Sequence, residues 1–143
     1  MAMAHPARRR PSKAARSVGY AFAAAGNIVF WLLVMVWPGW EVVPFLTQDV
    51  TQLLGLFGFS VLVSVVANLA WIVHDGPGFK ALGELAIAAI GFALAWRVLV
   101  VFPFDFAGLG YDLTVLVRVV VVIGVVGSAI GVIAALVRLA RAL

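Results

Sequence analysis

The chain has 143 residues, a net charge of +4 and no cysteine, and 65% of its residues are hydrophobic while 11% are charged. Soluble domains contain about 45–50% apolar and about 25% charged residues, so this composition excludes a soluble globule and predicts an integral membrane protein. The lack of cysteine excludes disulfides and thiolate chemistry. Nucleic-acid binding would need a basic face on a soluble surface, so we expect no nucleic-acid partner.

Residues 1–18 form a polar, basic segment that contains Pro6 and Pro11. Because proline interrupts helices, we expect a cytoplasmic tail here that is either disordered or laid along the membrane surface. The apolar run that follows is too long for a signal peptide, so we interpret it as an uncleaved anchor. Either the positive charges of the tail only fix the topology, or they also bind anionic lipid at the membrane surface; they are Arg8, Arg9, Arg10, Lys13 and Arg16.

Four apolar runs follow in chain order, and they cover about residues 20–37, 50–74, 79–102 and 112–139. A helix needs about 20 residues to cross a hydrocarbon core of about 30 Å. Backbone polar groups have no water partners in hydrocarbon, so spanning runs of this length must be helices. Residues 19–143 therefore predict an all-α membrane protein, a four-transmembrane-helix bundle with up-down-up-down topology.

The first and third links have the same make-up. Each begins with an aromatic-Pro pair that ends one helix and finishes with an Asp-x-Thr that opens the next. Asp49 is the expected N-cap of the second helix, with Gln52 completing a variant of the capping box. The second link, Asp75–Gly78, is a tight turn by composition. The two hairpins are either a parallel internal repeat or two units that meet the same needs for helix stops and caps.

The distribution of Lys and Arg predicts the orientation. Positive residues occur in the tail, at Lys80 and at the C-terminal Arg138 and Arg141, whereas the first and third links contain none. Both termini and the second link are therefore expected on the cytoplasmic side of the inner (plasma) membrane, as in a multi-pass protein. The acidic residues of the outer links are Glu41, Asp49, Asp105 and Asp112.

Glu84 is an ionisable residue within a predicted span, and such residues are candidates for function because burying them costs free energy. Lys80 lies four residues earlier on the same helix face, so a surface ion pair is one interpretation. The other is a membrane carboxylate that binds protons or cations, joined by Asn27 and Asn68 at comparable depth in the inner half. Such a polar cluster is either a site or hydrogen-bonded packing.

Arg97 and Arg118 lie within spans near the outer side. Helical side chains lean toward the helix N-terminus. Arg97 therefore leans into the bilayer, and we expect it to pair with an outer acid or to hold an anion or lipid headgroup. Arg118 leans outward, so it snorkels or pairs there. The candidate acids are Asp49, Asp105, Asp112 and Glu41.

Two further stripes predict packing faces. Ser60, Ser64 and Asn68 follow one side of the second span, and they either pack against another helix or line a wet path. The fourth span contains two small-xxx-small patterns, which allow close approach of helices; the residues are Gly124, Gly127, Ser128 and Gly131.

Catalytic and cofactor motifs are lacking. There is no phosphate-binding loop, no nucleophile elbow and no HExxH sequence. The two histidines, His5 and His74, have no spacing that suits a haem or a metal. We therefore expect no enzyme activity, no cofactor and no metal.

Several segments carry a resemblance to a family, namely Trp37-Pro-Gly-Trp40, Pro44-Phe-Leu-Thr47, Asp49 and Val101-Phe-Pro-Phe-Asp105. Over residues 20–110 the chain resembles uncharacterised small four-span membrane proteins of high-GC bacteria. The resemblance implies the four-span fold and no activity or ligand. The chain does not resemble the small multidrug transporters, whose carboxylate lies in the first span, where this chain has Asn27.

Two main functions fit these observations, and a lipid-binding site formed by Arg97 and Arg118 under the outer links is a third hypothesis. The first is a non-enzymatic interaction protein, an accessory or scaffold subunit, which suits the small polar content of the spans. The alternative is an oligomeric transporter or channel for a small solute or ion, with its polar site near Glu84, Asn27 and Asn68. The expected partners are the lipid bilayer and a homo-oligomer or larger membrane complex.

Overall fold

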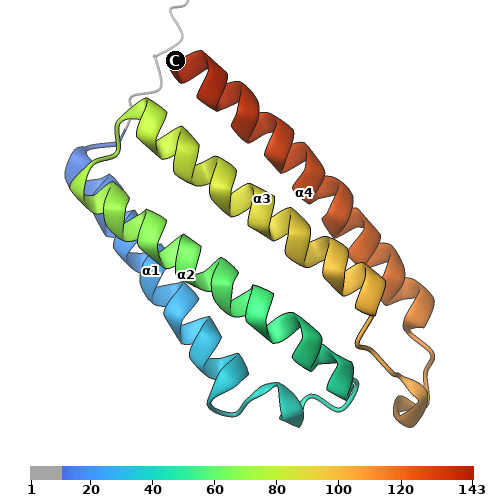
Figure 1. Ribbon diagram of the computed structural model, residues 1–143. Helices are drawn as coiled ribbons and strands as arrows, with labels where there is room; N and C mark the ends of the chain where they lie inside the picture. Colours follow the sequence, from blue (N-terminus) through green and yellow to red (C-terminus); the bar gives the residue numbers. More distant parts are fainter. Residues whose placement is uncertain (1–10) are drawn as a thin grey trace, which may run out of the picture.

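The computed structural model describes residues 11–143, in which four long helices are joined by three links (Figure 1). All four are long and apolar enough to cross a membrane, by length and composition. The protein is therefore a multi-pass membrane protein, and the predicted all-α four-helix fold is confirmed. The helices are α1 (Lys13–Met35), α2 (Thr51–Val73), α3 (Pro77–Val101) and α4 (Thr114–Ala142). The links contain short 3-10 turns, η1 (Trp40–Val42), η2 (Gln48–Val50) and η3 (Ala107–Leu109).

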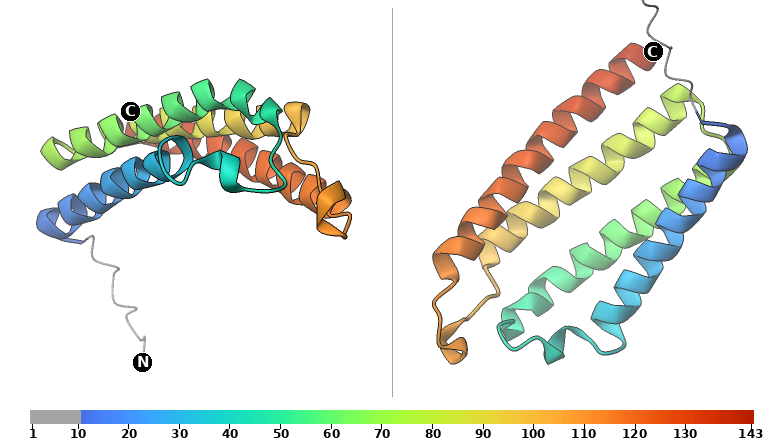
Figure 2. Two further views of the ribbon diagram at one scale, coloured as in Figure 1. Left: turned by 90° about the horizontal axis from the view of Figure 1, so that it is seen from below. Right: turned by 180° about the vertical axis from the view of Figure 1, so that it is seen from behind.

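The helices run alternately up and down, which gives the molecule two distinct ends (Figures 1 and 2). The termini end contains the start of α1, the short link of residues 74–76 and the end of α4. The link end contains the first link, residues 36–50, and the third link, residues 102–113. The two long links therefore lie at the same end, as the predicted topology requires.

Packing joins helices that are consecutive in the chain: α1 with α2, α2 with α3, and α3 with α4. Figure 2 shows the result as a curved layer, with α1 and α4 at its two edges. Few side chains are buried in such a layer, and most large apolar side chains lie at the surface where lipid can cover them. The buried apolar residues of the four long helices are Tyr20, Ala24, Leu53, Val61, Trp71, Ala81, Val125 and Ala135.

The start of α1 corrects the predicted tail. Residues 13–18 are helical, because Ser12 acts as the N-cap and its Oγ accepts a hydrogen bond from the backbone N–H of Ala15 at 3.2 Å. Pro11 precedes this cap and so does not interrupt the helix. The rest of the predicted tail, including Arg8, Arg9 and Arg10, lies outside the described residues.

The other helix boundaries differ from the prediction by a few residues. Pro77 is the first residue of α3 instead of part of a turn, since a proline loses no hydrogen bond at that position. At the start of α2, Asp49 is not the N-cap. Thr47 caps η2 by accepting from the Asp49 N–H at 3.3 Å, while Gln52 donates to the Asp49 carboxylate at 3.4 Å.

Backbone hydrogen bonds join the two long links. The Thr47 N–H donates to the Pro103 carbonyl at 2.9 Å, and the Asp105 N–H donates to the Phe45 carbonyl at 2.8 Å. These bonds flank an isolated antiparallel bridge between Leu46 and Phe104. The hairpin α1–α2 is thus tied to the hairpin α3–α4 at the link end.

An aromatic cluster covers this connection. Phe45 lies 5.5 Å from Phe106, measured between ring centroids, and Phe106 is buried. Phe102, which ends α3, adopts a left-handed conformation with φ of 43° that is costly for a residue with a side chain. Its ring packs at 5.1 Å from that of Phe104. The cluster holds the two links together and supports this turn of the backbone.

Candidate functional site

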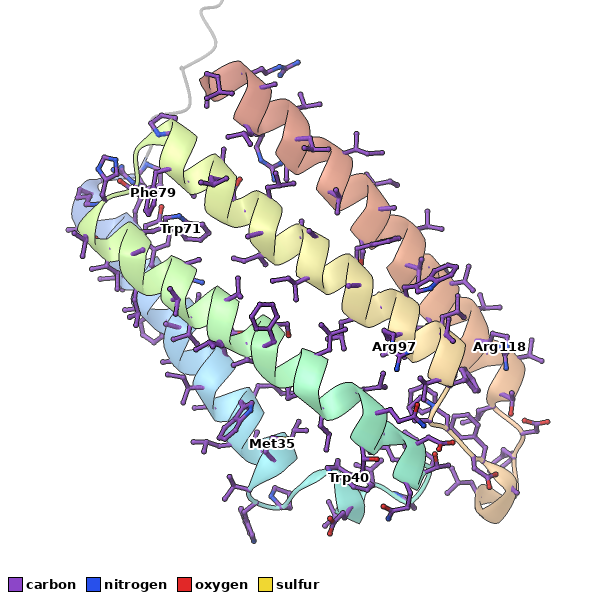
Figure 3. The ribbon with its side chains drawn as sticks, viewed as in Figure 1. Met35, Trp40, Trp71, Phe79, Arg97 and Arg118 are labelled. Carbon is purple, nitrogen blue, oxygen red and sulfur yellow. The ribbon has the colours of Figure 1, made fainter. Side chains whose placement is uncertain are left out.

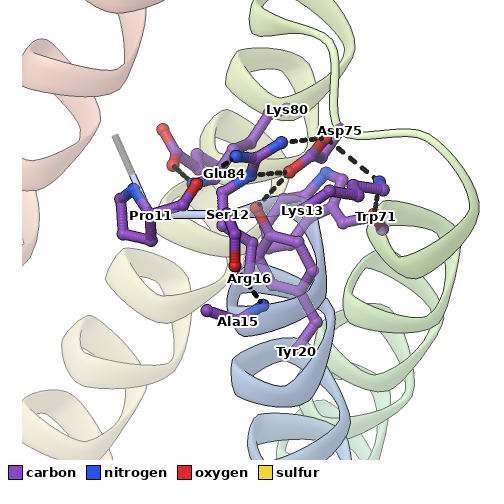
Figure 4. Close-up of polar contacts among 10 residues, drawn as sticks. All are labelled: Pro11, Ser12, Lys13, Ala15, Arg16, Tyr20, Trp71, Asp75, Lys80 and Glu84. Atoms are coloured by element: carbon purple, nitrogen blue, oxygen red, sulfur yellow. Dashed lines mark hydrogen bonds and ion pairs between the residues drawn. The ribbon is translucent and has the colours of Figure 1, made fainter. Parts of the chain in front are cut away.

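Asp75, in the short link between α2 and α3, is the most connected polar residue of the described chain. It is only 6% exposed, and its carboxylate accepts hydrogen bonds from Lys13 Nζ at 3.1 Å, Arg16 Nε at 2.6 Å and the Tyr20 hydroxyl at 3.0 Å (Figure 4). The three donors are spaced three and four residues apart, which places them on one face of α1. One carboxylate therefore fastens the start of α1 to the α2–α3 link.

The surroundings of Asp75 stabilise its charged form. Hydrogen bonding from the Arg16 guanidinium lowers the pKa of Asp75 well below its usual range, although burial acts in the opposite direction. Lys13 and Tyr20 add to the lowering through their own hydrogen bonds. Asp75 is therefore ionised at neutral pH, and its charge is compensated by two cations.

Trp71 of α2 contacts two of the donors to this carboxylate, Tyr20 and Lys13. Its ring centroid lies 5.5 Å from that of Tyr20, and its backbone carbonyl accepts a hydrogen bond from Lys13 at 3.3 Å. On its other side is Gly83 of α3, where an added Cβ would approach Trp71 Cζ2 to 2.7 Å. The indole thus lies between α1 and α3, and it fits only because residue 83 has no side chain.

Glu84 continues the polar contacts from α3 to α4. Its carboxylate accepts from Arg138 Nε at 2.9 Å and lies 4.0 Å from Lys80 Nζ. Lys80 in turn lies over the ring of Tyr20, 5.4 Å from the centroid. These contacts connect α1, α3 and α4 at one end of the molecule. We call the whole set the termini-end network: Lys13, Arg16, Tyr20, Asp75, Lys80, Glu84 and Arg138.

The predicted polar cluster of Glu84, Asn27 and Asn68 is not formed by hydrogen bonds. Asn27 donates to the carbonyl of Ala23 at 2.9 Å, and Asn68 donates to the carbonyl of Ser64 at 2.7 Å. Each amide therefore bonds to its own helix, one turn back. The predicted Lys80–Glu84 pair is present, but Arg138 is the closer partner of Glu84.

The predicted pairing of Arg97 and Arg118 with outer acids is wrong for the described residues, 11–143. Both side chains are exposed, and neither has a carboxylate within 4.0 Å. Figure 3 shows them near the link end. Arg118 lies over the ring of Phe102 at 4.3 Å from its centroid. Aromatic contact takes the place of an ion pair there.

The outer acids stabilise turns instead. Asp105 accepts from the N–H of Ala107, and Asp112 accepts from the N–H of Thr114, each at 3.0 Å. Hydrogen bonding from Thr114 also lowers the pKa of Asp112. A short acidic side chain can satisfy a nearby backbone N–H at little entropic cost. These carboxylates are therefore used locally and do not reach the arginines.

The glycines of α4 do not pack against α3. The residues of α4 that are buried are Val125 and Ala135, whereas Gly124 and Gly127 are exposed. An added Cβ at Gly124, Gly127 or Gly131 would meet nothing within 4 Å. Ser128 donates to the Gly124 carbonyl of the same helix at 2.7 Å. The predicted packing face is thus uncovered in the single chain.

Sequence reasoning missed Asp75, Arg16 and Tyr20 as members of one site. Asp75 lies within Asp-Gly-Pro-Gly, a composition that predicts only a turn. The sequence did contain a signal for this site. Asp75 is an acidic residue in the second link, which is predicted on the same side of the membrane as the basic segment that contains Lys13 and Arg16. In the described chain, no group of three or more His, Cys, Asp or Glu side chains gathers in a way that could hold a metal ion.

No protein-family model, curated protein or solved structure matches this chain significantly. The resemblance to small four-span membrane proteins of high-GC bacteria therefore stays a prediction. The assignment that the helices support is that of a multi-pass membrane protein.

Proposed function

We propose that this protein is a non-enzymatic interaction subunit of the membrane, which acts as an accessory or scaffold protein. The observation that carries the proposal is the packing of the helices in a single layer, each mainly on its chain neighbours. Such a layer leaves long apolar faces on α1 and α4 for another membrane protein to cover. Phe22 of α1 is 75% exposed and Ile130 of α4 is 62% exposed.

The use of the polar residues favours this function over transport. A solute path through hydrocarbon needs polar groups that are free to bind the solute. Asn27 and Asn68 bond to backbone carbonyls of their own helices, and Glu84 is held by two cations near the helix ends. These residues are engaged in structure, which leaves little chemistry for a moving ion.

We place the termini end at the cytoplasmic face of the inner membrane. Five of the basic residues of the described chain lie at this end, and cytoplasmic loops are enriched in Lys and Arg. They are Lys13, Arg16, Lys80, Arg138 and Arg141.

Photo-cross-linking in native membranes tests the interaction directly. A photoreactive residue is placed at Phe22, Leu62 or Ile130, exposed positions on three helices. A scaffold predicts cross-links to one defined protein, or to a second copy of this chain, from some positions and not from others. Cross-links to lipid alone from every position would reject it.

Flux in proteoliposomes tests the transport alternative. We expect no uptake or release of protons or alkali cations beyond that of empty liposomes. If flux is found and Glu84→Gln abolishes it while the melting temperature is kept, the protein is a transporter. Arg118→Gln, at the other end of the molecule, is the matched control.

A further inference from the structure

We infer that a pocket between the start of α3 and the end of α4 binds a phosphate group, supplied by the headgroup of an anionic membrane lipid. The pocket has a volume of about 370 Å³. The pocket does not include the exposed faces of α1 and α4 discussed above. The phosphate site and the interaction function are therefore independent proposals, and one can be correct if the other is wrong.

The charge of the pocket favours an anion. Three cations and one carboxylate line it: Lys80, Arg138, Arg141 and Glu84. Glu84 is shared between Lys80 at 4.0 Å and Arg138 at 2.9 Å. Arg141 has no carboxylate within 4.0 Å among residues 11–143. The lining residues thus carry two positive charges more than negative ones, and one guanidinium is free to bind.

The chemistry of these groups suits phosphate. Guanidinium presents paired N–H donors that match two phosphate oxygens, and such charge-assisted bonds are stronger than neutral ones. Arg138 and Arg141 lie three residues apart on α4, so they share one side of the helix. The Lys80 ammonium adds a cation from α3, on the opposite wall of the pocket.

The position of the pocket suits a lipid headgroup. It lies at the termini end, where α3 begins and α4 ends and where a spanning helix reaches headgroup depth. Its remaining wall is apolar, formed by Pro77, Ala81 and Ala142. Basic pockets between membrane helices at headgroup depth bind anionic headgroups. The phosphate would contact the cations while the glycerol backbone lies against the apolar wall.

Lipid retention by the full chain tests the site. The detergent-purified protein is titrated with phosphatidylglycerol, and with phosphatidylcholine as the zwitterionic reference, whose phosphate charge is balanced by its choline. Bound lipid is counted by native mass spectrometry. We expect phosphatidylglycerol to bind preferentially. Arg141→Gln should weaken its binding about tenfold, since a charge-assisted bond is lost. Glu84→Gln should keep or strengthen it, because a competing carboxylate is removed.

Arg118→Gln is the matched control, since it removes an exposed arginine of the same helix outside the pocket. Equal loss in Arg118→Gln and Arg141→Gln, or no loss with Arg138 and Arg141 both changed to Gln, would overturn the site. Inorganic phosphate separates the two sources. Millimolar phosphate that raises the melting temperature of the wild type but not of Arg141→Gln assigns the pocket to free phosphate. An effect of the lipid alone assigns it to the headgroup, and no effect of either refutes it.

Discussion

Arg16 of α1 and Asp75 of the α2–α3 link are joined by a hydrogen bond of 2.6 Å between Nε and Oδ2. A second contact runs from Arg16 Nη2 to Oδ1 at 3.3 Å, so the two side chains meet in a bidentate geometry. Bidentate pairs fix direction as well as distance. The position of the start of α1 relative to the α2–α3 link therefore depends on this pair.

Asp75→Asn should lower the thermal stability of the detergent-purified protein. The amide keeps the size of the carboxylate but leaves Arg16 and Lys13 without their anionic partner. We expect the melting temperature to fall by several degrees, measured by the intrinsic fluorescence of Trp71 and the other tryptophans. Asp105→Asn is the control, because that carboxylate bonds only to a neighbouring turn. An equal fall in both variants would contradict the role of Asp75.

The same carboxylate predicts how stability depends on pH. Because the folded protein lowers the pKa of Asp75, its contribution is complete above the pKa of the unfolded chain, about 4, and is lost as the pH falls through the folded-state pKa. The melting temperatures of wild type and Asp75→Asn should therefore differ by a constant amount from neutral pH to about pH 5 and converge below about pH 4.

Asp112→Asn serves as the reference in that titration, since Asp112 also has a lowered pKa but bonds only to Thr114. A gap between wild type and Asp75→Asn that stays constant into strong acid would show that Asp75 does not contribute as an anion.

Gly83→Ala should destabilise the protein by about 1–3 kcal/mol, the usual cost of overpacking. The new methyl group would lie 2.7 Å from Trp71 Cζ2, so α2 and α3 would have to separate or the indole would have to move. Gly91→Ala on the same helix meets nothing within 4 Å and should be neutral. Combining Gly83→Ala with Trp71→Phe should restore part of the loss, and failure to do so would argue against this contact.

Arg97→Leu should leave the melting temperature nearly unchanged, because Arg97 is exposed and has no carboxylate partner within residues 11–143. Arg16→Leu is the informative comparison, since it removes a paired arginine and should lower the melting temperature clearly. A large loss in Arg97→Leu would revive the ion pair that the position of Arg97 in the span had suggested.

Single-cysteine labelling can test the orientation without background from the chain itself, because it contains no cysteine. Tyr111→Cys lies in the third link, and its side chain is 76% exposed. Leu143→Cys lies at the termini end. With a membrane-impermeant maleimide, we expect intact cells to label only Tyr111→Cys and permeabilised cells to label both. The opposite pattern would reverse the topology.

The helices could be predicted because backbone N–H and C=O groups in hydrocarbon must bond to one another, which an apolar run of this length achieves as a helix. The aromatic-Pro pairs at residues 37–38 and 102–103 do lie where α1 and α3 end. The contact between Lys80 and Glu84 could also be predicted, because residues four apart on a helix lie on one face. The helix ends and the Lys80–Glu84 contact both depend on residues that are close in the sequence, so the sequence alone was enough to predict them.

The rest of the termini-end network could not be read from spacing. Lys13 and Arg16 lie 62 and 59 positions from Asp75, and Arg138 lies 54 positions from Glu84. Such contacts depend on the rotation of each helix about its own axis. Depth in the membrane was the only guide for Asn27 and Asn68, and equal depth does not make two side chains face each other.

The backbone bonds between Phe45, Thr47, Pro103 and Asp105 have a mechanical consequence. Together with the termini-end network, they join the two hairpins at the link end and at the termini end, so sliding or separation of the hairpins would break contacts at these ends. Midway between the two ends, a Cβ added at Gly91 or Gly124 would meet nothing within 4 Å. Bending of the layer across the middle of its helices would keep both sets of contacts. A change of curvature is therefore the deformation that costs this fold the fewest contacts.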